Sequence, residues 1–66
     1  MIALTAREQQ VLRLIAEGQN NRQVAGSLRI SEHGVKRTVG IILAKLNCPN
    51  HTLAVVRAVE SGLLAV

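Results

Sequence analysis

The sequence contains no phenylalanine, tyrosine, tryptophan or aspartate, and it has only one proline and one cysteine. Without aromatic side chains the core must be aliphatic, and single-stranded bases cannot stack on aromatic rings. The lone cysteine, Cys48, cannot form an internal disulfide, which is typical of a reducing cytosol. Apolar runs reach only four residues, as at 41–44, and the N-terminus lacks the layout of a secretory signal. We therefore expect a cytoplasmic protein without a transmembrane helix.

The residues needed for catalysis or metal binding are missing as well. The four acidic residues are glutamates on different segments, and the five glycines form neither a P-loop nor a dinucleotide-binding fingerprint. His33 and His51 lie far apart, and a single cysteine completes no metal-ligand spacing. We expect no enzyme activity, no metal and no cofactor.

Aliphatic residues and unevenly placed cations are what the sequence does contain. Its 66 residues are 48% hydrophobic, enough for one small domain with a thin core. The charges at both ends cancel, and the net charge of +4 comes from the middle, where Glu32 opposes the five cations Arg22, Arg29, Lys36, Arg37 and Lys45. A basic centre between neutral ends favours an anion-binding face, as in nucleic-acid binders, although a solubilising surface is the alternative.

Capping signals divide the chain into four predicted helices and no strands, so the predicted fold class is all-α. Thr5 with Glu8, and Asn20 with Gln23, have the spacing of capping boxes, and Ser31 is a good N-cap. Glycines and a proline-containing turn supply the stops. The predicted helices are roughly 6–17, 21–28, 32–46 and 51–61, and Leu63 and Leu64 are expected to fold back onto the core.

A long, basic third helix that follows a three-residue break is typical of a helix-turn-helix. Its predicted inner face is aliphatic and its outer face is basic or small. The inner face consists of Val35, Val39, Ile42 and Leu46, and the outer face of His33, Lys36, Arg37, Gly40 and Ala44. Such a helix can be held from behind while its front enters a major groove about 12 Å wide. A solvated charged stripe on an ordinary bundle helix is the alternative interpretation.

Three motifs follow one another in register along the chain. They are Leu4-Thr5-x-Arg7-Glu8-x-x-Val11-Leu12, then Asn21-x-x-Val24-Ala25-x-x-Leu28-x-Ile30-Ser31-x-x-x-Val35-Lys36, then Val39-x-x-Ile42-Leu43-x-Lys45-Leu46. Together they resemble the LuxR-type (GerE-like) helix-turn-helix domain of NarL/FixJ response regulators and quorum-sensing activators. The resemblance implies a DNA-binding transcriptional regulator that acts as a dimer. We expect residues 1–66 to be one domain, either the C-terminal output domain of a longer regulator or a stand-alone regulator.

The resemblance and the helical wheel together assign candidate contacts to double-stranded DNA. Lys36 and Arg37 are the leading candidates for base contact, and Gly40 offers close backbone approach. The candidates for phosphate contact are Thr5, Asn21, Arg22, Ser31, His33 and Lys45. Capping alone accounts for Thr5 and Ser31, and phosphate rather than base contact is the alternative for Lys36 and Arg37. The chain departs from the family pattern at Gly34, Thr38, Pro49 and His51. These departures bear on its affinity for DNA rather than on its fold.

The fourth predicted helix carries the expected homodimer contact. Its outward side consists of Leu53, Val56, Arg57 and Glu60, a small self-complementary patch that is expected to pair weakly, or only on DNA. RNA polymerase is a further candidate partner, and no membrane partner is expected. Two other functions stay open at this point, a protein-interaction module with weakened DNA binding and a promoter-binding domain like region four of a sigma factor.

Overall fold

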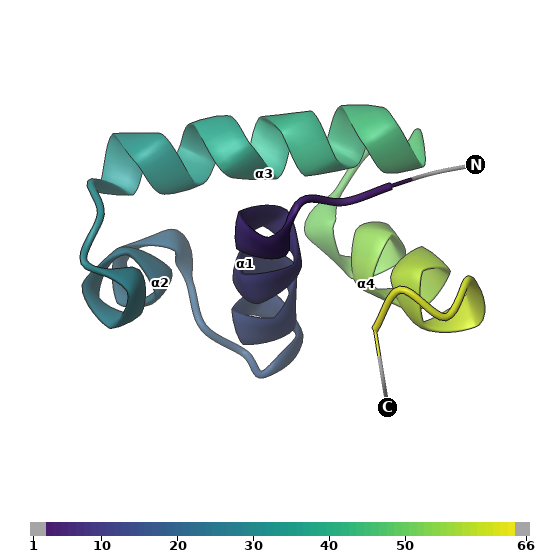
Figure 1. Ribbon diagram of the computed structural model, residues 1–66, viewed down its shortest axis with the longest axis horizontal. Helices are drawn as coiled ribbons and strands as arrows, with labels where there is room; N and C mark the ends of the chain where they lie inside the picture. The colour runs from purple at the N-terminus through teal and green to yellow at the C-terminus, as the bar shows by residue number, and fades with distance from the viewer. Residues whose placement is uncertain (1–2, 65–66) are drawn as a thin grey trace.

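The computed structural model describes residues 3–64, and within them the chain forms four helices and no strand (Figure 1). The helices are α1 (Ala6–Ala16), α2 (Asn21–Leu28), α3 (Glu32–Leu46) and α4 (His51–Glu60). The predicted all-α class is confirmed. The predicted ends of the first and fourth helices were each one residue too late, because Glu17 and Ser61 are C-caps rather than helical residues.

Each helix begins where a side chain satisfies a free backbone amide of its first turn. At α1 the capping box is complete: the Glu8 N–H donates to Thr5 Oγ1 at 3.1 Å, and the Thr5 N–H donates to Glu8 Oε1 at 2.9 Å. The side chains of Asn20, Ser31 and Asn50 cap the other three helices in the same way. Local sequence therefore fixes all four starting points.

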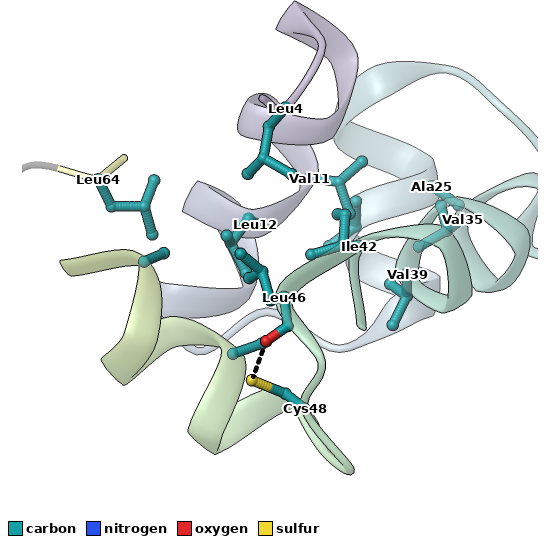
Figure 2. Packing of buried hydrophobic residues seen from close by; sticks show 13 residues of the cluster. Leu4, Val11, Leu12, Ala25, Val35, Val39, Ile42, Leu46, Cys48 and Leu64 are labelled. Atoms are coloured by element: carbon teal, nitrogen blue, oxygen red, sulfur yellow. Dashed lines mark hydrogen bonds between the residues drawn. The ribbon is translucent and has the colours of Figure 1, made fainter. Parts of the chain in front are cut away.

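Helix α3 crosses one side of the molecule, and the other three helices lie together on its opposite side (Figure 1). The core lies between these two layers and is wholly aliphatic apart from one cysteine (Figure 2). Its largest fully buried side chains are Val11, Leu12, Val24, Val35, Ile42 and Leu46. The predicted folding back of Leu63 and Leu64 is also found, because Leu64 is buried in this cluster and Leu63 packs against it. One face of α3 is thereby held by the whole domain.

Cys48 is a core residue, which the sequence did not indicate. Cys48 is only 9% exposed, and its Sγ donates to the Leu46 carbonyl oxygen at 3.3 Å (Figure 2). The turn after α3 therefore closes the core between α3 and α4.

No single helix within residues 3–64 is both long and apolar enough to cross a membrane. Helices α3 and α4 reach the required length and composition only as a pair, which is bent by 53°.

Candidate nucleic-acid interface

The turn between α2 and α3 is held by backbone bonds and by one left-handed residue. Arg29 ends α2 with a φ of 56°, and the Ile30 N–H donates to the Ala25 carbonyl oxygen at 3.1 Å. Ile30 packs against the core, and Ser31 then caps α3. These contacts fix the second helix of the pair relative to the first, as a helix-turn-helix requires.

The two faces predicted for α3 are found in the structure. Val35, Val39, Ile42 and Leu46 are buried, and His33, Lys36, Arg37, Gly40 and Ala44 are exposed. The other three helices all lie on one side of α3 and leave its opposite side uncovered (Figure 1). The exposed face of α3 is therefore uncovered, while the opposite face is held rigidly by the core.

Lys36 and Arg37 lie on this uncovered surface with their charges available. Both are exposed, and neither takes part in the ion pair found within residues 3–64. Gly40 follows one turn later, and a Cβ built there would meet nothing within 4 Å. Two cations and a residue without a side chain thus stand next to one another, and another molecule can approach all three.

Thr5 and Ser31 combine the capping role with a free donor. Each hydroxyl oxygen accepts the capping hydrogen bond of its own helix, and both residues are exposed. A hydroxyl that accepts one bond still has its own proton to donate. Capping and phosphate binding are therefore compatible at both positions.

The start of α2 borders an open hollow of about 370 Å³. Its lining residues are Asn20, Asn21, Arg22, Glu32 and His51. Arg22 is exposed, but Asn21 is half-buried, and within residues 3–64 its Oδ1 has no hydrogen-bond partner. Arg22 is consequently much better placed to meet an anion than Asn21.

Lys45 is engaged inside the domain. Its Nζ lies 2.8 Å from Glu8 Oε1 and donates to the Ala3 carbonyl oxygen at 3.3 Å. The Lys45 ammonium and the Thr5 amide, which both donate to the Glu8 carboxylate, hold the Glu8 pKa below its ordinary value. Lys45 therefore links α3 to the N-terminal cap of α1, and the Glu8 carboxylate neutralises much of its positive charge. Sequence reasoning assigned Glu8 to the cap alone, because nothing local signals a partner so far along the chain.

Two of the four dimer candidates on α4 form an exposed apolar pair. Leu53 is 44% and Val56 48% exposed, and Glu60 lies on the same exposed side. Beside Val56 an open hollow of about 240 Å³ is lined by Ile15, Ala16, His51, Thr52, Val55 and Val56. Arg57 is directed differently, because its Nη1 donates to the Leu46 carbonyl oxygen at 3.3 Å and so satisfies the end of α3.

No cluster within residues 3–64 has the three or more His, Cys or Glu side chains that a metal ion needs. His33 and His51 are both exposed and lie on different helices.

The fold and its uncovered basic helix define the class of helix-turn-helix domains. The model of the luxR family of bacterial regulatory proteins matches residues 2–58, so the chain belongs to this family. It is a DNA-binding domain of the kind found in transcriptional regulators, as the resemblance implied.

Several relatives are similar along nearly the whole chain. The transcriptional regulatory protein DegU of Brevibacillus brevis is 43% identical over 63 residues, which is 96% of this chain and 27% of DegU. The response regulator VraR of Staphylococcus aureus is 39% identical over 61 residues, 92% of this chain and 29% of VraR. The crystal structure of ChrA, the response regulator of a heme-sensing two-component system, superposes with a TM-score of 0.91 at 40% identity, covering 94% of this chain and 31% of ChrA. The chain thus spans less than a third of the length of these relatives.

Proposed function

We propose that the domain binds double-stranded DNA sequence-specifically, with α3 in the major groove, and so regulates transcription. The observation that carries the proposal is the uncovered face of α3, on which Lys36 and Arg37 are exposed while the opposite face is locked in the core. A major groove about 12 Å wide admits one such helix. The family supports the same function, because its members include transcriptional regulators.

In the proposed complex the contacts divide between bases and phosphates. Lys36 and Arg37 reach base edges, Arg37 through the paired acceptors of guanine, and Gly40 lets the backbone come close. Thr5, Ser31, Arg22 and His33 meet phosphates beside the groove: all four are exposed, Ser31 and His33 lie at the start of α3, and Arg22 lines the hollow that Glu32 of α3 also lines. Asn21 and Lys45 add less, since Asn21 is half-buried and the Lys45 ammonium is bound to Glu8.

Replacing Arg37 or Lys36 by alanine is expected to relax the base preference at separate positions of the binding site. Loss of one paired arginine–guanine contact costs about 1–3 kcal/mol of discrimination, about 5- to 150-fold in affinity for the preferred base. The measurement is the selection of bound duplexes from a random pool with each variant, followed by titration of single-base changes. Arg13→Ala is the matched control, because Arg13 is an exposed cation in the last turn of α1. This end of the helix is the one that lies away from α3 (Figure 1).

The outcomes of this experiment separate base reading from general attraction. If both variants keep the full consensus and lose only affinity, the two side chains contact phosphate and not bases. Binding of the unaltered domain should weaken with salt by about 0.9 log unit per phosphate contact for each log unit of salt. An apolar protein interface is nearly insensitive to salt, so a flat response would favour the alternative function of a protein-interaction module.

We further propose that two copies pair through α4 on DNA, around Leu53 and Val56, with Glu60 at the edge. Both are among the three large hydrophobic side chains that are exposed within residues 3–64. Arg57 contributes less to this contact than Leu53 and Val56, because its guanidinium group is bonded to the end of α3. A patch of this size supports a weak dimer that is stabilised when two half-sites, about 10 base pairs apart, hold the copies side by side.

Val56→Glu is therefore expected to abolish cooperative binding to a two-half-site duplex, because it puts two like charges at the centre of the patch. The readout is the mass of the complex in sedimentation, together with the binding curve on one and on two half-sites. Gln10→Glu adds the same charge at an exposed position of α1 and should leave cooperativity unchanged. Equal cooperativity in the Val56→Glu variant and the unaltered domain would rule out this dimer contact.

The biological setting follows from the lengths of the relatives. Because the chain corresponds to less than a third of DegU, VraR and ChrA, we propose that it works as the output domain of a bacterial regulator, in the cytoplasm. RNA polymerase is the proposed second partner on promoter DNA. The match to the luxR family model disfavours the sigma-factor alternative.

A further inference from the structure

We infer that Ile41 reads the 5-methyl group of a thymine in the major groove, and that the second half of α3 recognises bases by apolar contact. This inference rests on the proposed function. Its starting point is that Ile41 is 43% exposed, one of three large hydrophobic side chains that are exposed in residues 3–64. The other two, Leu53 and Val56, lie on α4.

The position of Ile41 makes it part of the proposed DNA surface. It follows Arg37 by four residues, so it lies on the same side of α3 about 6 Å further along the helix axis. Successive base pairs are about 3.4 Å apart, so both side chains fall within one half-site. Gly40 and Ala44 are exposed next to it and are too small to hold a base surface away.

The fold does not require an isoleucine at this position. The core face of α3 is already complete with Val35, Val39, Ile42 and Leu46. A β-branched residue is also a poorer helix former than alanine, lysine or glutamate. An exposed isoleucine therefore adds nothing to helix formation and leaves apolar surface in water. Contact with an apolar group of a partner explains why it is there.

Thymine supplies that apolar group. The edges of base pairs in the major groove present donors and acceptors, and the thymine methyl is the apolar feature among them. Beyond Arg37 the exposed side of α3 offers little to those donors and acceptors: Gly40 and Ala44 have no polar side-chain atoms, and the Lys45 ammonium is bound to Glu8. This half of the helix can therefore discriminate bases chiefly through Ile41.

Deoxyuridine differs from thymidine only by this methyl group, so it provides a direct test. Each thymine of the selected half-site is replaced in turn by deoxyuridine, and affinity is measured for the unaltered domain, Ile41→Ala and Ile41→Val. At one position we expect the unaltered domain to lose about fourfold in affinity, as for one buried methyl group. The Ile41→Ala variant should be insensitive to deoxyuridine at that position, and Ile41→Val should keep most of the effect.

The results distinguish the two levels of the proposal. If deoxyuridine changes the affinity of the unaltered domain and of Ile41→Ala by the same factor at every thymine position, the role of Ile41 is overturned while DNA binding stands. The same holds if the selected site contains no thymine. If the unaltered domain binds no duplex in a salt-dependent way, the proposed function itself fails. Ile41→Ala should melt close to the unaltered domain, so that a loss of binding cannot be attributed to unfolding.

Discussion

Replacing Ile42 by alanine is expected to leave the domain largely unfolded. Ile42 is 1% exposed, and its side chain lies in the aliphatic cluster of the core (Figure 2). Removing such a side chain costs about 2–5 kcal/mol, from the lost burial and from the cavity left behind. A domain of this size rarely has more than about 3–5 kcal/mol of stability from a single core, and no disulfide adds to it here.

The neighbouring residue provides a matched control, since Ile41 and Ile42 have the same side chain on the same helix. Ile41→Ala removes the same atoms from an exposed site and is expected to change the free energy of unfolding by no more than about 0.5 kcal/mol. Ile42→Val should cost about 0.5–1.5 kcal/mol. Denaturant unfolding followed by circular dichroism measures all three. Equal stabilities of the two alanine variants would contradict the division of α3 into a buried and an exposed face.

That division is the part of the fold that the sequence predicts well. The start of each helix depends on residues only three positions apart, such as Thr5 with Glu8, and so can be read locally. The buried face of α3 follows from the spacing of aliphatic residues along one helix. The exposure of Lys36 and Arg37 follows as well, because it is the complement of the same pattern.

Contacts between residues far apart in the chain are what the sequence left undetermined. Lys45 reads as a free cation until α1 is placed beside α3, where it meets the Glu8 carboxylate. Arg57 reads as an outward charge until the end of α3 places the Leu46 carbonyl oxygen within its reach. In both cases a flexible, charged side chain takes the best acceptor that tertiary packing offers, and helical periodicity carries no information about that choice.

The glycines on α3 are a further case in which the sequence does not show what surrounds a residue. Gly34 stands where the family pattern has a larger residue, and a Cβ there would lie 3.1 Å from Ser31 Oγ. A side chain at position 34 would therefore press on the Ser31 hydroxyl that caps α3, and the sequence alone does not reveal this. At Gly40 the surrounding space is open, so nothing inside the domain excludes a side chain, and the surface it leaves bare faces the proposed DNA groove.

Glu8→Ala is expected to destabilise the domain by about 2 kcal/mol, although the residue is polar and belongs to the first turn of a helix. Its buried carboxylate accepts both the Thr5 N–H and the Lys45 ammonium. The lost cap accounts for about 1 kcal/mol. The charged hydrogen bond to Lys45 contributes a similar amount, less than in a dry interior because Lys45 is 36% exposed. Glu8→Gln keeps an oxygen for the Thr5 N–H and should lose only the second part.

The pH dependence of unfolding separates these two contributions. The Glu8 pKa is lowered in the folded domain, chiefly by the hydrogen bond from Lys45. The ionised carboxylate therefore stabilises the folded state fully above the ordinary glutamate pKa, and this stabilisation is lost as the pH falls through the lower, folded-state value. Unfolding free energies measured from pH 7 downwards should show the unaltered domain approaching Glu8→Gln in acid, whereas a constant gap would refute the ion-pair contribution.

Glu8→Gln also releases Lys45, so at neutral pH it should steepen the salt dependence of DNA binding if the freed ammonium reaches a phosphate.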